Sequence, residues 1–448
     1  GYYTTKNGYE CVIKNYFLEN DREYYLDKSD DISKLTIQNS TIESLPLNFL
    51  QDLEYLEDLT LINSKVNHVD QLSLYNLRKI DFSASGINYL APRAFYGCPN
   101  LTEIDLSDNR IGYLSEDLFE KVPRKLDLSY NSFEKLNLTF FEYCPSWLDV
   151  SHNNLTNIWF KFLPPDFVLN VSFNALRNLE IPCHYSGTQI NAESNEISSL
   201  KFYDIGPHGE SCDSCFYKTM NFNNNQLGSN IRELCKCVGL ENLFLASNNI
   251  DNLGSCFFRM KKLKELHLWG NNIYQLNHDS FHPDNEIETL DLSFNRIEAV
   301  DEYTMSIFTK LKYLYLDGNQ LYDFNLSPKL YMPKLVGVGL SHNKLKCSKL
   351  FLLIKQFKND YIQFLVDESL PVNTTNIDGI SCYQNHEGEL LKSQNNLETI
   401  LKQSTKENIN FLLKKINTLE DKLVNIFAFK RNIEESVKMN TQGVNENK

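Results

Sequence analysis

The chain has 448 residues, of which 42% are hydrophobic and 23% charged, and its formal net charge is −14. This composition is too apolar for a disordered chain and too acidic for a nucleic-acid-binding protein. The length suggests about three globular domains unless the sequence is built of repeats. The sequence contains no run of about 18 apolar residues, so it predicts no membrane-spanning helix.

Residues 1–31 are predicted to form an N-terminal cap, because a solenoid exposes its core at both ends. Two apolar stretches in this region, Cys11-Val12-Ile13 and Tyr24-Tyr25-Leu26, are expected to pair as a hairpin. Cys11 has no neighbouring cysteine, so we expect it to face an upstream partner or a second chain. Eleven cysteines in all favour an exported chain whose leader has been removed.

Residues 32–346 are predicted to form a leucine-rich repeat solenoid. The pattern L-x-x-L-x-L-x-x-N-x-L has clean matches that begin at Leu101, Leu263 and Leu311, and its second leucine position recurs fourteen times, mostly 21 to 24 residues apart. Each L-x-L predicts a short strand, and stacked strands predict a parallel sheet on the concave side of an α/β solenoid. The second leucine position is occupied by Leu35, Leu59, Ile80, Ile104, Leu126, Leu148, Leu169, Ile190, Met220, Leu243, Leu266, Leu290, Leu314 and Val338.

An asparagine ends the strand pattern from the fourth repeat onward, as at Asn109 and Asn131. Its side-chain amide is expected to bond backbone groups that the turn leaves unpaired, which is a structural role. The first three repeats carry Ser40, Ser64 and Ser85 at this position.

Six cysteines cluster in repeats eight to eleven, where the spacing between Ile190 and Met220 widens to 30 residues. Two or three disulfides are expected among them, and the sequence does not select the pairing. The alternative is a zinc site made by Cys212, Cys215, Cys235 and Cys237. The six cysteines are Cys183, Cys212, Cys215, Cys235, Cys237 and Cys256.

Cys98 and Cys144 occupy a repeat column whose other members are apolar, so we expect both to be buried free thiols. They lie two repeats apart, about 10 Å, which exceeds the limit of about 7 Å for a disulfide.

Residues 347–382 are predicted to form a C-terminal cap closed by a Cys347–Cys382 disulfide. Residues 350–357 are amphipathic, and residues 361–366 resemble a strand.

Residues 383–448 are predicted to be helical and to contain an apolar heptad seam of about four repeats. A coiled coil with another chain is our main interpretation, and a helix folded onto the solenoid is the alternative. Leu390, Leu397 and Leu401 extend the seam backward more weakly. The seam consists of Ile409, Leu412, Ile416, Leu419, Leu423, Ile426, Ile433 and Val437.

The residue between the paired leucines faces the concave surface of the predicted sheet. In repeats three to six it is Asp81, Asp105, Asp127 and Asp149, which form a ladder spaced by about 4.8 Å. This ladder is interpreted either as an ordinary solvated strand face or as a track that binds a cation or a basic ligand. The later repeats offer a protein-contact set made of Phe244, His267, Trp269, Tyr313 and Tyr315.

Seven sequons support export: Asn39, Asn100, Asn137, Asn154, Asn170, Asn325 and Asn373. A glycan on Asn170 would block the concave face near the seventh repeat. The sequence has no metalloprotease, serine-hydrolase, phosphate-loop or dinucleotide-binding motif. We therefore predict no catalytic residue, metal site or cofactor.

The order of repeats, cysteine-bounded cap and heptad helix resembles the secreted leucine-rich repeat immune proteins of mosquitoes, the Anopheles Plasmodium-responsive and LRIM families. Tyr9-Glu10-Cys11-Val12 and residues 37–46 look like the amino-terminal region of that family. The resemblance implies pairing through cysteines and coiled coils, a haemolymph location and contact with thioester-containing complement-like proteins.

Our main hypothesis is a secreted, glycosylated protein of insect innate immunity that recognises or scaffolds complement-like or pathogen-associated proteins and forms a homo- or heterodimer. The alternative is an extracellular adhesion or developmental ligand-binding protein, or a shed receptor ectodomain, without an immune role.

Overall fold

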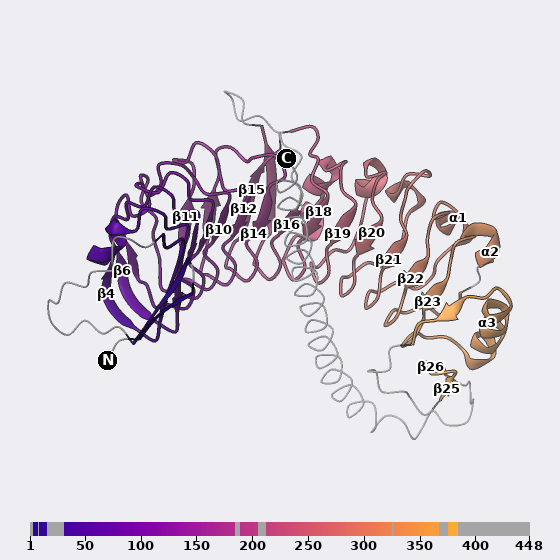
Figure 1. Ribbon diagram of the computed structural model, residues 1–448. Coiled ribbons are helices and arrows are strands. Elements are labelled where there is room, and N and C mark those ends of the chain that lie inside the picture. Colours follow the sequence, from indigo (N-terminus) through magenta and orange to yellow (C-terminus); the bar gives the residue numbers. More distant parts are fainter. Residues whose placement is uncertain are drawn as a thin grey trace, which may run out of the picture.

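A computed structural model describes residues 3–7, 9–15, 31–183, 189–204, 212–324, 327–366 and 375–383. Figure 1 shows these residues as one curved solenoid that runs from the N-terminal cap to helix α3. The predicted heptad seam at 409–437, its weaker extension at 390–401 and the sequons at Asn325 and Asn373 lie outside the described residues.

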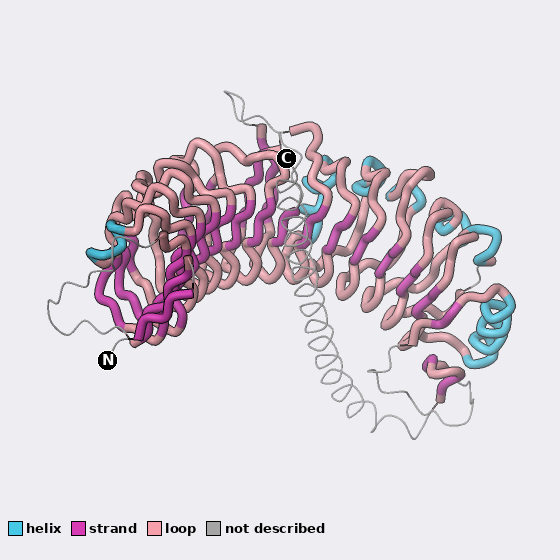
Figure 2. Tube along the Cα trace, in the orientation of Figure 1, coloured by secondary structure: helices cyan, strands magenta, loops and turns pink. Residues whose placement is uncertain are grey.

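The fourteen repeats form fourteen neighbouring parallel strands, as predicted. The marker residues of adjacent repeats are register partners along the whole sheet, and they are buried. Figure 2 shows the strands side by side from repeat to repeat. They are β3 (Lys34–Gln38), β5 (Asp58–Ile62), β7 (Lys79–Asp81), β9 (Glu103–Asp105), β10 (Lys125–Asp127), β12 (Trp147–Asp149), β14 (Val168–Asn170), β16 (Gln189–Asn191), β18 (Thr219–Asn221), β19 (Asn242–Phe244), β20 (Glu265–His267), β21 (Thr289–Asp291), β22 (Tyr313–Tyr315) and β23 (Gly337–Gly339).

The N-terminal cap is a hairpin, but one strand differs from the prediction. Strand β2 (Glu10–Lys14) pairs antiparallel with β1 (Tyr3–Asn7) and parallel with β3. Both edges of β2 are therefore occupied, so the expected partnership of residues 11–13 with residues 24–26 is wrong; the latter lie outside the described residues. Strand β2 extends the repeat sheet by one strand, with Cys11 in register with Leu35.

The remaining elements of the repeats follow each sheet strand and return the chain to the next repeat. Buried leucine, isoleucine and phenylalanine side chains fill the space between them and the sheet. Phenylalanine rings stack between repeats, as Phe95 does on Phe119 at 5.8 Å. The short helices are η1 (Asn48–Asp52), η2 (Gly228–Lys236), η3 (Cys256–Arg259), η4 (His278–Ser280), α1 (Glu302–Met305) and α2 (Pro328–Tyr331). Three small parallel sheets lie outside the repeat sheet: β4 (Thr41–Leu45) with β6 (Lys65–Val69) and β8 (Tyr89–Leu90), β11 (Lys135–Asn137) with β13 (Asn157–Trp159), and β15 (Asn178–Pro182) with β17 (Ser199–Tyr203).

The C-terminal cap consists of α3 (Cys347–Asn359), β24 (Gln363–Phe364) and the hairpin β25 (Asn376–Ile377) with β26 (Ile380–Ser381). Helix α3 turns Leu350, Leu353, Ile354 and Phe357 into the core, and β24 adds a last parallel strand to the sheet beside β23. The predicted disulfide between Cys347 and Cys382 is present.

The asparagine column links each repeat to the one before it. The Asn131 amide donates to the backbone oxygen of Leu106 at 2.8 Å, and its Oδ1 accepts from the Ile111 N–H at 2.9 Å. In the second repeat, Ser64 Oγ accepts from the Ser40 N–H at 3.1 Å and donates to the Ile37 oxygen at 3.2 Å. The serine thus bonds the corresponding backbone oxygen, but it accepts from an N–H two positions earlier in the preceding repeat than the one that donates to the asparagine.

Candidate functional site

The four aspartates lie in register at the ends of neighbouring strands β7, β9, β10 and β12. One oxygen of each carboxylate is used inside its own repeat. Asp127 Oδ1 accepts from the Ser129 backbone N–H at 3.0 Å and from the Ser129 hydroxyl at 2.7 Å. The same two bonds join Asp81, Asp105 and Asp149 to the serine two residues later. The D-x-S sequence therefore has a local structural role, because it closes the turn after the strand.

The second carboxylate oxygen, Oδ2, has different hydrogen-bond partners in the four aspartates. Asp149 Oδ2 accepts from the Asn170 amide at 2.8 Å. Among the described residues, no hydrogen bond engages Oδ2 of Asp81, Asp105 or Asp127. One side of the track is thus structural, and the other offers acceptor oxygens to a cationic group.

The crowding of these carboxylates changes their protonation. Burial, and next the charge of Asp149, raise the pKa of Asp127 to about 7. Burial also raises the pKa of Asp149. Near neutral pH the track therefore carries less than its four formal charges, and a bound cation would favour release of the remaining protons.

Asn170, Asn191 and Asn221 continue the same row on β14, β16 and β18. Asn170 Oδ1 accepts from the Ser172 N–H at 3.2 Å and from its hydroxyl at 2.7 Å, so it repeats the aspartate geometry. The side chain is half-buried and hydrogen-bonded at both ends. The Asn170 side chain therefore links strand β14 to β12 within the sheet. The described sequons at Asn39, Asn100, Asn137 and Asn154 are instead exposed.

Four of the five predicted contact residues gather on the later strands. The Phe244 and His267 rings stack with centroids 4.9 Å apart, and His267 Nδ1 lies 3.8 Å from Asp291 Oδ2. Tyr315 is half-buried beside Asp291 in the same row, and Tyr313 is 37% exposed. These residues form one aromatic patch with an acidic neighbour.

Trp269 does not belong to this patch, contrary to the prediction, because its side chain is only 3% exposed. Strand alternation places Phe244, His267 and Tyr315 on the open face, but the chain has begun to turn at Trp269. Most other repeats have serine at this position, as at Ser293, where the side chain is also buried.

A stack of three rings was not predicted. Tyr130, His152 and Phe173 lie one position before the column asparagine, and their centroids are 4.1 Å and 4.3 Å apart with nearly parallel rings. All three residues have φ between 53° and 55°, a conformation that bulky side chains seldom adopt. Aligning the repeats by column would have found this stack, since most other repeats place asparagine, aspartate, glycine, alanine or serine there.

The six clustered cysteines form three disulfides: Cys183–Cys212, Cys215–Cys237 and Cys235–Cys256. The zinc alternative is therefore wrong for this structure, because all four proposed ligands are bonded to another cysteine. The described residues also contain no cluster of three or more His, Cys, Asp or Glu side chains suited to a metal ion.

Three further cysteines are buried. Burial raises the pKa of Cys98 to about 11 and that of Cys144 to about 12, and both are free thiols as expected. Cys11 is 4% exposed within β2. This burial argues against a second chain as the partner of Cys11, because an intermolecular disulfide needs an accessible sulfur, and the expected upstream partner stays a prediction.

In the part of the chain that the structure describes, no helix has the length and apolar character needed to cross a membrane.

A family model described as "Leucine rich repeat" matches residues 75–124, 238–297 and 261–321. The crystal structure of the APL1 leucine-rich repeat domain is 23% identical, with a TM-score of 0.63 over 84% of this chain and 98% of that chain. The LRIM1/APL1C complex is 21% identical, with a TM-score of 0.65 over 98% of this chain and 82% of that chain.

The structure of the Toll–Spatzle complex from Drosophila is 18% identical, with a TM-score of 0.51 over 81% of this chain and 58% of that chain. These likenesses concern the fold, which is typical of protein-interaction scaffolds. The chain is a leucine-rich repeat solenoid, and the APL1 and LRIM1/APL1C leucine-rich repeat proteins are among its structural neighbours.

Proposed function

We propose that the chain is a secreted, glycosylated recognition or scaffold protein of insect innate immunity that binds proteins through its concave face. Four disulfides within the described residues support an extracellular location, since such bonds persist in oxidising compartments. The solenoid shares its fold with APL1 and LRIM1/APL1C, which supports an immune role.

The observation that carries this proposal is the change of chemistry along one row of the sheet. From β7 to β22 the row passes from carboxylates through amides to the aromatic patch. Ten strand-to-strand steps of about 4.8 Å make this surface about 48 Å long. A surface of this length suits a protein that is basic at one end and apolar at the other, because a small ligand would contact only two or three strands.

The test compares two variants of the row with a control. Asp81→Asn with Asp105→Asn removes charge but keeps the oxygen that bonds the following serine, and Phe244→Ala removes one anchor of the aromatic patch. Tyr75→Ala is the control, because Tyr75 is 71% exposed and lies in the loop between β6 and β7.

The tagged proteins are used to capture partners from the extracellular fluid of the source, and the captured proteins are identified by mass spectrometry. We expect a partner that the intact chain and the Tyr75 variant recover and that both concave-face variants lose. A partner recovered equally by all four proteins would argue against concave-face recognition.

We further propose that residues 409–437 form a coiled coil with a second copy of this chain or with another leucine-rich repeat chain. The LRIM1/APL1C complex among the structural neighbours supports pairing of two different repeat chains. Ile416→Asp with Leu423→Asp should abolish the association, whereas Lys415→Asp should preserve it. Sedimentation that finds the intact chain monomeric, both alone and in the extracellular fluid, would refute this pairing.

A thioester-containing complement-like protein is the partner class that we propose for the concave face. Its presence among the proteins captured by the intact chain, and its absence with the Asp81/Asp105 variant, is the expected result. Direct binding measured with the two purified proteins would separate contact from co-capture.

An adhesion protein, a developmental ligand-binding protein or a shed receptor ectodomain is the second candidate. The fold likeness to a chain of the Toll–Spatzle complex favours it. The full-length transcript distinguishes the two candidates, since a membrane span encoded after Lys448 would identify a receptor ectodomain and exclude a soluble factor.

A further inference from the structure

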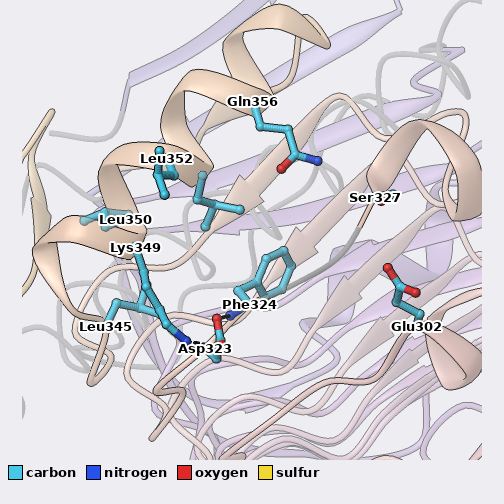
Figure 3. Close-up of a pocket in the computed structure, with 10 residues that line it drawn as sticks. Glu302, Asp323, Phe324, Ser327, Leu345, Lys349, Leu350, Leu352 and Gln356 are labelled. Carbon is cyan, nitrogen blue, oxygen red and sulfur yellow. Dashed lines mark hydrogen bonds and ion pairs between the residues drawn. The ribbon is translucent and has the colours of Figure 1, made fainter.

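A groove lies between the C-terminal helix α3 and the loops of the last repeats, on the side of the molecule away from the sheet. Figure 3 shows Leu350 and Leu352 of α3 on one side of the groove, with Phe324 at its centre. Its volume is about 380 Å³, near the lower end of the usual range for ligand pockets. Leu352 is 65% exposed although it belongs to this apolar lining. The groove therefore presents apolar surface that a few additional side chains would cover.

The rim of the groove is polar and carries one available negative charge. Asp323 is paired with Lys349 across one side. Glu302, at the start of α1, is exposed on the opposite side, and among the described residues its side chain is bonded only by the Tyr331 hydroxyl. An occupant that carries apolar side chains and one adjacent positive charge would match this arrangement.

The described chain ends beside the groove. The Tyr383 N–H donates to the backbone oxygen of Leu345 at 3.0 Å, and the Cys347 N–H donates to the Tyr383 oxygen at 3.1 Å. Leu345 lines the groove. Residues 384–389 connect Tyr383 to Leu390-Leu391-Lys392. Six extended residues reach up to about 20 Å, which is ample for a return to the groove.

We propose that Leu390-Leu391-Lys392 of this same chain docks in the groove, with the leucines against Phe324, Leu350 and Leu352 and the lysine beside Glu302. The short connection favours binding of this segment over a segment of another chain, because residues 384–389 hold it at a high local concentration near the groove. A segment of another chain would have to compete with it from solution. The docking would fix the direction in which residues 409–437 leave the cap, and it does not depend on the proposed immune role.

The test measures amide hydrogen exchange of residues 388–394 in the full-length protein. The intact chain should protect these amides. Leu352→Asp should lower the protection at least about tenfold, because it replaces an apolar contact of the docked leucines by a charge. Phe351→Asp is the matched control, since Phe351 is the preceding residue of α3, is 58% exposed and does not line the groove. It should leave the protection unchanged.

A second pair of variants tests the charge. Glu302→Lys should loosen the segment, and Glu302→Lys combined with Lys392→Glu should restore its protection. Unchanged exchange of residues 347–359 verifies that α3 stays folded in each variant.

Exchange at the intrinsic rate in the intact chain would overturn the proposal, and so would equal losses in the Leu352 and Phe351 variants. Protection that disappears on dilution would assign the groove to a second molecule and would also overturn it. Loss of coiled-coil pairing with intact protection of residues 388–394 would refute the proposed pairing and leave this inference standing.

Discussion

Replacing Asp127 with asparagine should stabilise the fold at neutral pH. Asp127 lies between Asp105 and Asp149 in the sheet, and burial together with those charges raises its pKa to about 7. Asparagine keeps the Oδ1 that accepts from Ser129 and removes the charge. Asn170 already makes these same bonds in its own repeat, so the substituted side chain has a precedent in this sheet.

The expected gain follows from the pKa of Asp127. A rise from 3.8 to about 7 corresponds to at most about 4 kcal/mol at neutral pH. We expect about 1–2 kcal/mol, because the open side of the track is in contact with water, which screens the charges.

The pH dependence has a definite sign. The folded state binds this proton more tightly than the unfolded state, so the wild-type protein loses this contribution to stability as the pH rises from about 4 through 7. The gain in Asp127→Asn should therefore be largest above pH 7 and nearly absent at pH 4.

Urea unfolding followed by circular dichroism at pH 7.5 and pH 4.0 measures this difference. Asp81→Asn is the comparison, because Asp81 has a carboxylate neighbour on one side only, Thr60 being its register partner on the other. Its gain should be smaller. A gain for Asp127→Asn that is equal at the two pH values, or a loss of stability at pH 7.5, would refute the electrostatic argument.

Three further predictions follow from the contacts described above. Intact glycopeptide mass spectrometry should find glycan on exposed Asn154 and none on Asn170, whose side-chain amide already donates to Asp149 within the sheet; full glycan occupancy of Asn170 would show that this hydrogen bond is dispensable. Asn248→Ala should lower the free energy of unfolding by about 2–3 kcal/mol, because the Asn248 side chain is fully buried and bonds Phe222 O and Ala246 O; denaturant melts that show less than about 0.5 kcal/mol would contradict this role. Cys98 and Cys144 should resist iodoacetamide in the folded protein and react after unfolding, since burial raises both pKa values; peptide mapping that finds rapid native labelling would show that either site opens readily.

Much of the fold is predictable because the repeat fixes it at every level. A leucine in the marker column is buried only when its strand lies in register with the neighbouring repeats. The column asparagine finds hydrogen-bond partners only on the backbone of its own repeat and of the repeat before it. The sequence predicted a strand at residues 11–13 but not its partners β1 and β3, because Glu10–Lys14 alternates in burial without the leucine pattern. Cys11 was therefore expected to face a partner outside the solenoid, although it occupies the marker column beside Leu35.

The candidate site was predictable only in part. The aspartate row is visible in the sequence. Which oxygen of each carboxylate bonds the following serine, and which stays on the open face, depends on the geometry of the turn after the strand. Trp269 was assigned to the open face because strand alternation was extended two residues beyond the end of β20. The pairing of six nearby cysteines depends on how the widened repeat folds, which spacing alone does not determine.

The reversed direction of strand β1 has a consequence for assembly. A parallel array that ended in another parallel strand would offer a ready template for the next molecule, and copies would add end to end as a filament. Because β1 runs antiparallel to β2, a copy joining there would meet backbone of the opposite polarity, and neither the leucine column nor the asparagine bonds would continue across the junction. Among the described residues, the last strand of the sheet at the opposite end is β24, which has two residues. Strand β1 is thus a poor template for end-to-end addition of a second copy.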